Sequence, residues 1–212
     1  TTINDFYKHP KVGDDFNETW RYNITLNNGT KIFLNYVYMK VPLKGTKCGA
    51  NVSLYNYRGK NYQVGRQYPS ARYKEDRTQQ LISIKNSTGR DNVFYMKGKP
   101  GPGHTIKFLT SKNEGFDIDL KVIESYPGRV KGDGVFSIHG KKTGLFVHLP
   151  TAKITGTIRV GKIKENVTGT MYMEQIWQSH ASTEISSHSF QIYGPKSPIM
   201  GNIIVGSKDL KS

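Results

Sequence analysis

The sequence predicts an all-β protein, with strands that follow one another along the chain and form an antiparallel barrel of about ten strands. The first observation behind this prediction is residue choice. Of 212 residues, 72 are β-branched or aromatic, whereas Ala and Leu together number 14. Side chains of the first kind favour strands, and Ala and Leu favour helices. The second observation is turn chemistry, because 22 Gly and 9 Pro supply breaks between short apolar runs.

The clearest strand pattern lies at Trp20–Leu26. Its apolar residues alternate with polar ones, as in a strand with one buried face. Asn27-Asn28-Gly29 follows and is typical of a hairpin turn. The next run, Lys31–Val41, carries apolar residues on both faces, which predicts a strand covered on both sides. Residues 42–49 are expected to form a loop.

Further strands are expected where β-branched and aromatic residues are bounded by turn signals. These ranges are 52–57, 80–84, 93–96, 105–110, 116–122, 144–149, 154–160, 167–177, 187–193 and 202–205. The polar stretch 68–80 has room for one short helix, and residues 97–103, rich in Gly and Pro, are expected to be a loop. Such a meander closes as an up-and-down barrel or packs as a sandwich.

The chain is strongly basic, with a net charge of +15 and a pI near 9.8. The basic residues are spread along the chain without a recognition helix or an aromatic–basic RNA motif, which argues against a nucleic-acid partner. Dispersed lysines are typical of a solvated surface, and contact with membranes or acidic glycans stays open. The mean hydropathy is −0.58. No apolar run approaches the roughly 18–20 residues of a spanning helix, so a helical membrane protein is excluded.

Six Asn-x-Ser/Thr sequons favour a secreted glycoprotein, since chance predicts about two. They begin at Asn17, Asn23, Asn28, Asn51, Asn86 and Asn166. The chain opens at Thr1 without an apolar leader, as a processed secreted protein or a cytosolic one would. The single cysteine, Cys48, permits no intrachain disulfide. We expect an unreactive loop cysteine or an intermolecular disulfide rather than a reactive thiol.

Signatures of common catalytic sites are missing. The sequence has no Gly-x-Ser-x-Gly elbow and no phosphate-binding loop. Six histidines are present, and none lies two or four residues from another, so no zinc pair on one strand is predicted. We therefore expect neither a metal nor a required cofactor.

Several segments, in order, resemble the AttH/CrtC family of lipocalin-like proteins, which includes carotenoid hydratases, fungal pericyclases and survival factors. Glu18-Thr19-Trp20-Arg21-Tyr22-Asn23, Asn28-Gly29 and Phe33-Leu34-Asn35-Tyr36-Val37-Tyr38 are similar to the opening hairpin of that family. Leu149 to Ile158 resembles its Pro-Arg-x-x-Val-x-Gly-x-Ile strand, and Gly169 to Trp177 resembles its Gly-x-Gly-Trp-x-Asp-His-x-Trp-Gly segment. The resemblance runs from about residue 16 to 205 and implies a lipocalin-like barrel.

The departures from the family matter for chemistry and for domain structure. Glu174-Gln175 stands where the family has Asp-His, and Gln175 cannot act as an acid or a base. Family members usually carry two barrels over about twice this length. We therefore expect one barrel at residues 1–186. Residues 187–212 would then complete it or pair with a second barrel or chain, with a homo-oligomer as one possibility.

The sequons predict a secreted glycoprotein, and the resemblance implies that it binds a long apolar molecule, with a carotenoid or another isoprenoid or lipid as ligand. One alternative is a polyene hydratase, isomerase or cyclase with Glu174 as its acid, although we favour a protein without catalytic activity. Another is a basic protein that holds acidic glycans or membranes. Strand aromatics and nearby polar groups form the expected ligand site: Tyr36, Tyr38, Phe116, Phe146, His148, Tyr172, Glu174, Gln175 and Trp177.

Overall fold

The computed structural model describes residues 1–9, 16–41, 43–89, 92–110, 115–138, 140–180, 186–193 and 200–206. Within these ranges the regular secondary structure is almost entirely strand. The strands are β1 (Asn17–Leu26), β2 (Lys31–Val41), β3 (Gly45–Tyr57), β4 (Lys60–Pro69), β5 (Tyr73–Asp76), β6 (Leu81–Lys85), β7 (Asn92–Lys97), β8 (Thr105–Leu109), β9 (Phe116–Ser125), β10 (Val135–Ile138), β11 (Lys141–Val160), β12 (Ile163–Gln178), β13 (Ser186–Tyr193) and β14 (Met200–Gly206).

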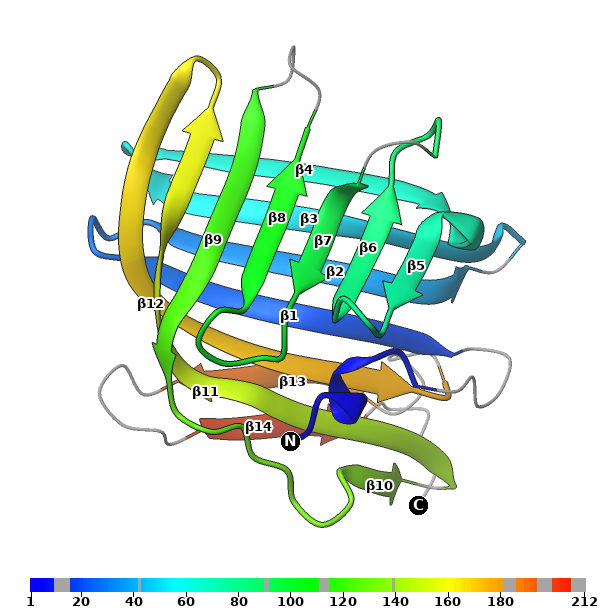
Figure 1. Cartoon of the computed structure of the whole chain (residues 1–212). Coiled ribbons are helices and arrows are strands. Elements are labelled where there is room, and N and C mark those ends of the chain that lie inside the picture. The colour runs from blue at the N-terminus through cyan, green and yellow to red at the C-terminus, as the bar shows by residue number, and fades with distance from the viewer. Residues whose placement is uncertain are drawn as a thin grey trace.

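One antiparallel sheet forms a nearly closed barrel of 11 strands. Its order is β4-β3-β2-β1-β12-β11-β9-β8-β7-β6-β5, and β10 pairs with β11 beside this path. In Figure 1, β1 to β4 form one layer and β5 to β9 cross in front of it, while β11 and β12 bend from one layer to the other. The predicted all-β barrel is therefore confirmed. None of the described helices is long and apolar enough to span a membrane.

The 20-residue strand β11 joins the two layers. Its last part pairs with β9, and its whole length lies against β12. The register with β12 shifts between Val147 and Leu149 and again between Leu149 and Ala152. Pro150 lies within the second shift. Proline has no backbone N–H, and because the strands are not regularly paired here, no hydrogen bond of the ladder is lost. The sequence predicts two strands, 144–149 and 154–160, where the structure has one strand with bulges.

The barrel interior is filled by the chain's own side chains. Its largest fully buried members include Trp20, Tyr22, Tyr36, Phe94 and Phe108. Even-numbered residues of β1 and β2 face inward together because their cross-strand partners share one face. Burial of such aromatic side chains contributes about 1.5–3 kcal/mol each, so these strands hold the barrel together mainly by apolar packing.

Three local predictions differ from the structure. The outer face of β2 is not covered throughout, since Phe33 is exposed. Residues 45–49 belong to β3 rather than to a loop. Cys48 is consequently buried, and this burial raises the pKa of its thiol to about 11. The prediction of an intermolecular disulfide at Cys48 is therefore wrong for the folded chain, because the sulfur is buried. The short helix expected within 68–80 is present as one turn of 3₁₀ helix, η2 (Ser70–Arg72), and β5 follows it.

Two segments lie outside the main sheet. The N-terminal residues 1–9, which we call the strap, contain one turn of 3₁₀ helix, η1 (Asn4–Phe6). The other segment consists of β13 and β14, which pair only with each other in the described residues. The expected domain boundary near residue 186 stays a prediction.

Candidate functional site

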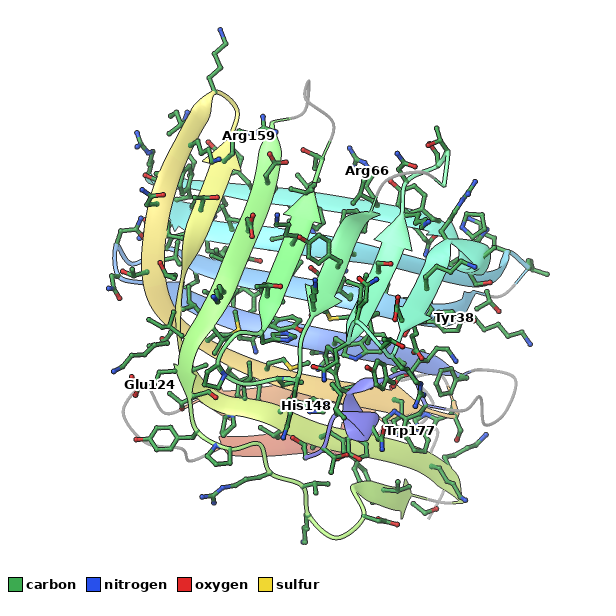
Figure 2. All side chains as sticks on the ribbon, in the orientation of Figure 1. Tyr38, Arg66, Glu124, His148, Arg159 and Trp177 are labelled. Atoms are coloured by element: carbon green, nitrogen blue, oxygen red, sulfur yellow. The ribbon has the colours of Figure 1, made fainter. Side chains whose placement is uncertain are left out.

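One end of the barrel interior is polar. Glu18 of β1 is the register partner of Tyr38 on β2 and of Trp177 on β12, so these three side chains share the inner face. Phe146 of β11 is the partner of Gln175 on β12. The bulge after Val147 turns His148 toward Gln175. In Figure 2 the labelled His148 and Trp177 lie beside η1, Tyr38 lies above them near β5, and Arg159 and Glu124 lie farther away.

The strap closes this end of the barrel. The Phe6 ring is fully buried and meets His104 and His148 edge-on, with ring centroids 5.5 and 5.7 Å away. Trp20 Nε1 donates to the Phe6 carbonyl oxygen at 2.9 Å. The strap thereby brings His9 next to β1 and β12. We call His9, Glu18, Phe146, His148, Gln175 and Trp177 the His9 cluster.

A directed chain of hydrogen bonds runs through the His9 cluster. Gln175 Nε2 donates to Glu18 Oε1 at 2.7 Å and to the Tyr7 carbonyl at 3.2 Å. This orientation leaves Gln175 Oε1 as an acceptor, so His148 Nε2, 2.9 Å away, must be its donor. At the other end His9 Nδ1 lies 2.8 Å from Glu18 Oε1. Gln175 is therefore occupied in holding Glu18 and His148.

Burial sets the protonation of the two deepest titratable groups of the cluster. Desolvation raises the pKa of Glu18, and the hydrogen bonds from His9 and Gln175 oppose that rise. Desolvation lowers the pKa of His148 to about 4. His148 is thus neutral near pH 7, with its one proton on Nε2.

Aromatic rings enclose His9. Its imidazole stacks on Phe146 with centroids 4.9 Å apart and lies 5.6 Å from the Trp177 ring. The indole of Trp177 rests on Gly144, where a Cβ atom would collide with it. A glycine at position 144 is therefore required for this ring placement.

Two polar atoms of the cluster have no hydrogen-bond partner among the described residues: His148 Nδ1 and Trp177 Nε1. Both are buried, and such atoms are usually satisfied by ordered water or by a ligand. The same described ranges bring together no three His, Cys, Asp or Glu side chains suited to a metal ion.

Two predicted site residues lie on the other face of the sheet. Glu174 and Tyr172 alternate with Met173 and Gln175 along β12 and so point away from the interior. Tyr172 Oη donates to Glu174 Oε2 at 2.6 Å, and Arg21 Nη1 lies 3.4 Å from Glu174 Oε1. Glu174 is therefore separated from the His9 cluster, and a catalytic role for it stays a prediction.

The remaining predicted residues divide between core and site. Phe116 packs on Phe108 at the opposite end of β11, and Tyr36 donates to the Lys107 carbonyl at 2.6 Å. Both are core residues apart from the His9 cluster. Tyr38 lies at the cluster's edge as the register partner of Glu18. Phe146, His148, Gln175 and Trp177 meet within the cluster.

Sequence reasoning missed Glu18 and His9. Glu18 falls in the same alternating series as Trp20 and Tyr22, so a carboxylate at a predicted buried position was a usable signal. His9 had no such signal, because the strap has no strand periodicity.

No family model and no curated protein matches this sequence. Among solved structures, a protein described as AttH from Nitrosomonas europaea matches with a TM-score of 0.56 at 16% identity, covering 85% of this chain and 56% of that one. A structure of CghA with Sch210972 matches with a TM-score of 0.58 at 10% identity, covering 84% and 49%. The fold is lipocalin-like. Kievitone hydratase from Nectria haematococca matches at 16% identity with a TM-score of 0.45, covering 79% and 49%. This chain therefore spans about half the length of these proteins.

Proposed function

We propose that this protein binds a small, largely apolar molecule at the end of the barrel that holds the His9 cluster. The observation that carries the proposal is a set of aromatic rings around a partly exposed imidazole, above a buried chain of polar groups. His9 is 18% exposed, and the Glu18 below it is 0% exposed. Apolar walls with a few placed polar groups are typical of small-molecule sites.

The ligand's position follows from what the interior already contains. Because Tyr36, Phe94 and Phe108 fill the centre, a long ligand cannot lie through the barrel without displacing them. We place the apolar body over His9 and Tyr38, with an oxygen of the ligand directed at the cluster. The two unpartnered atoms, His148 Nδ1 and Trp177 Nε1, support a site completed by a ligand or by water.

An isoprenoid, with a carotenoid as the sharpest version, is the proposed ligand class, in a secreted and glycosylated protein. A structure of a neighbour with the same fold was determined with Sch210972, which supports small-molecule binding in this fold. The test is an organic extract of the protein from its natural source, followed by absorption spectroscopy and mass spectrometry. An extract without pigment or lipid would overturn the ligand class.

Gly144→Ala tests the place of binding. The added Cβ meets the indole of Trp177, so we expect the ligand's affinity to fall about tenfold, roughly 1.4 kcal/mol. Quenching of intrinsic tryptophan fluorescence during ligand titration measures it. Gly65→Ala is the matched control, because its Cβ would meet Asn51 Cβ at 3.3 Å, a tight contact that involves no residue of the His9 cluster. Equal affinity in both variants would place the ligand elsewhere.

A further inference from the structure

The His9–Glu18 contact has the geometry of a carboxylate that orients an imidazole. Glu18 Oε1 lies 2.8 Å from His9 Nδ1, and the backbone N–H of His9 donates to Oε2 at 3.1 Å. Two bonds from one carboxylate to one residue fix both the position of the ring and its tautomer. Gln175 Nε2 also lies 3.4 Å from His9 Nδ1, too far to compete with the carboxylate for this nitrogen. The proton therefore belongs on Nδ1, and Nε2 carries the lone pair.

The carboxylate is itself held in place from behind. Gln175 Nε2 donates to Glu18 at 2.7 Å, and Gln175 is anchored by His148. The side chains of Glu18, Gln175 and His148 are all buried in the barrel. A partly exposed imidazole on a rigid buried support is the arrangement expected of a positioned general base.

The other ring nitrogen of His9 is Nε2. It makes no hydrogen bond within the described part of the chain, and the His9 side chain is 18% exposed. The Nδ1 edge is covered by Glu18 and one ring face by Phe146. A base without a protein nucleophile takes its proton from the bound molecule or from water.

We propose that His9 is a general base that moves a proton within a bound apolar ketone, with Glu18 and Gln175 as positioning residues. The step is a double-bond shift from a β,γ- to an α,β-unsaturated ketone. Nε2 takes a proton from the α-carbon, the C–H electron pair forms the enolate, and the imidazolium returns the proton to the γ-carbon. Atoms and electrons balance within the substrate, so no co-reactant is needed. This inference rests on the proposed binding function.

A cation at the same end of the barrel suits an enolate. Lys8 Nζ lies 5.1 Å from the ring centroid of Tyr38, the register partner of Glu18. An ammonium group there stabilises negative charge as it develops on the ketone oxygen. The apolar rings of the cluster match the body of such a substrate.

The test uses 5-androstene-3,17-dione, an apolar β,γ-unsaturated ketone, with the full chain. Binding is measured first, by quenching of tryptophan fluorescence. Turnover is then followed by ultraviolet absorption of the conjugated product and, in D2O, by deuterium uptake in mass spectra. We expect His9→Ala to lower the rate about 100-fold or more while binding changes less than about threefold, and added imidazole to restore part of the rate.

The variants separate positioning from structure. Glu18→Gln should lower kcat with little change in KM, and ¹⁵N NMR of His9 should show loss of the single Nδ1–H tautomer. Glu165→Gln is the control, a carboxyl near the other end of β12 that pairs with Arg58, and should keep the wild-type rate. Binding without turnover, or equal rates in wild type and His9→Ala, overturns the catalytic inference alone. Absence of probe binding counts against the proposed function and the inference together.

Discussion

Two buried histidines make this fold sensitive to acid. His104 donates from Nδ1 to the Gly98 carbonyl at 2.8 Å, so its Nε2, 2.9 Å from Tyr22 Oη, must accept. Both ring nitrogens are thus used by the neutral form. Burial lowers the pKa of His104 to about 4, as it does for His148. Protonation of His104 would break its hydrogen bond from Tyr22, and protonation of His148 would place a positive charge in the buried interior.

The folded chain should lose stability as the pH falls from about 6.5 toward 4. In this window the unfolded chain binds protons at His104 and His148 that the folded chain excludes, and each pKa shift corresponds to roughly 3 kcal/mol at most. Glu18 acts in the opposite sense, because its raised pKa lets the folded chain keep a proton. We expect the two histidines to outweigh this one carboxyl, so that acidification lowers the free energy of unfolding.

Urea unfolding near pH 7 and near pH 4.5 measures this loss. His104→Gln is the informative variant, because a glutamine can keep the bonds to Gly98 and Tyr22 without titrating. It should show a smaller acid-induced loss than wild type. The same loss in both proteins would mean that His104 does not carry the effect.

At the scale of elements, the alternation of apolar and polar residues predicted most of the strands. It did not predict features that depend on packing between distant parts of the chain. β1 matches its pattern because its inner face is uniformly apolar from Trp20 onward. β4 was missed although Tyr62, Val64 and Tyr68 alternate, because this edge strand is mostly polar between them. The bulge that turns His148 inward depends on the pairing of β11 with β12, which no local pattern encodes.

The strap is the element on which the candidate site depends. Phe6 is its only fully buried aromatic residue in the described chain, and it anchors the segment that carries His9. Phe6→Ala should lower the free energy of unfolding by about 3–5 kcal/mol, through lost burial and a cavity. It should also increase amide hydrogen exchange at residues 3–9.

Ile3→Ala is the control for Phe6→Ala, since Ile3 is partly buried and only packs against the core's edge. Ile3→Ala should lower the free energy of unfolding clearly less than Phe6→Ala does. A loss below about 1 kcal/mol for Phe6→Ala would show that the strap adds little to stability and does not fix His9 in place.

At the scale of the whole molecule, the barrel of described strands has a seam between β4 and β5, the two ends of the sheet order, which no backbone pairing joins. In the interior, Tyr68 of β4 packs toward Phe94 of β7, with ring centroids 6.1 Å apart. A barrel could be predicted from strand number, but this seam could not, because it joins segments whose contact depends on the path of every strand between them. The net charge of +15 surrounds this apolar interior, and contact with acidic glycans or membranes stays a prediction.

The sequons differ in how the folded barrel presents them. Asn28 lies exposed in the β1–β2 turn, and Asn166 is exposed on β12. Asn17 is partly buried, and its Nδ2 donates to the His180 carbonyl at 2.9 Å. A glycan on Asn17 would replace one of the two Nδ2 hydrogens and crowd the barrel end. If the protein is secreted as proposed, we expect glycans at Asn28 and Asn166 and an unmodified Asn17.

Peptide mass spectrometry after glycosidase treatment in H2¹⁸O marks each former glycan site. Asn28→Gln and Asn166→Gln should each remove one glycan mass, whereas Asn17→Gln should leave the mass of the glycoprotein unchanged apart from the substitution. A glycan on Asn17 would contradict this placement, and an unmodified chain from the natural source would contradict the secreted glycoprotein.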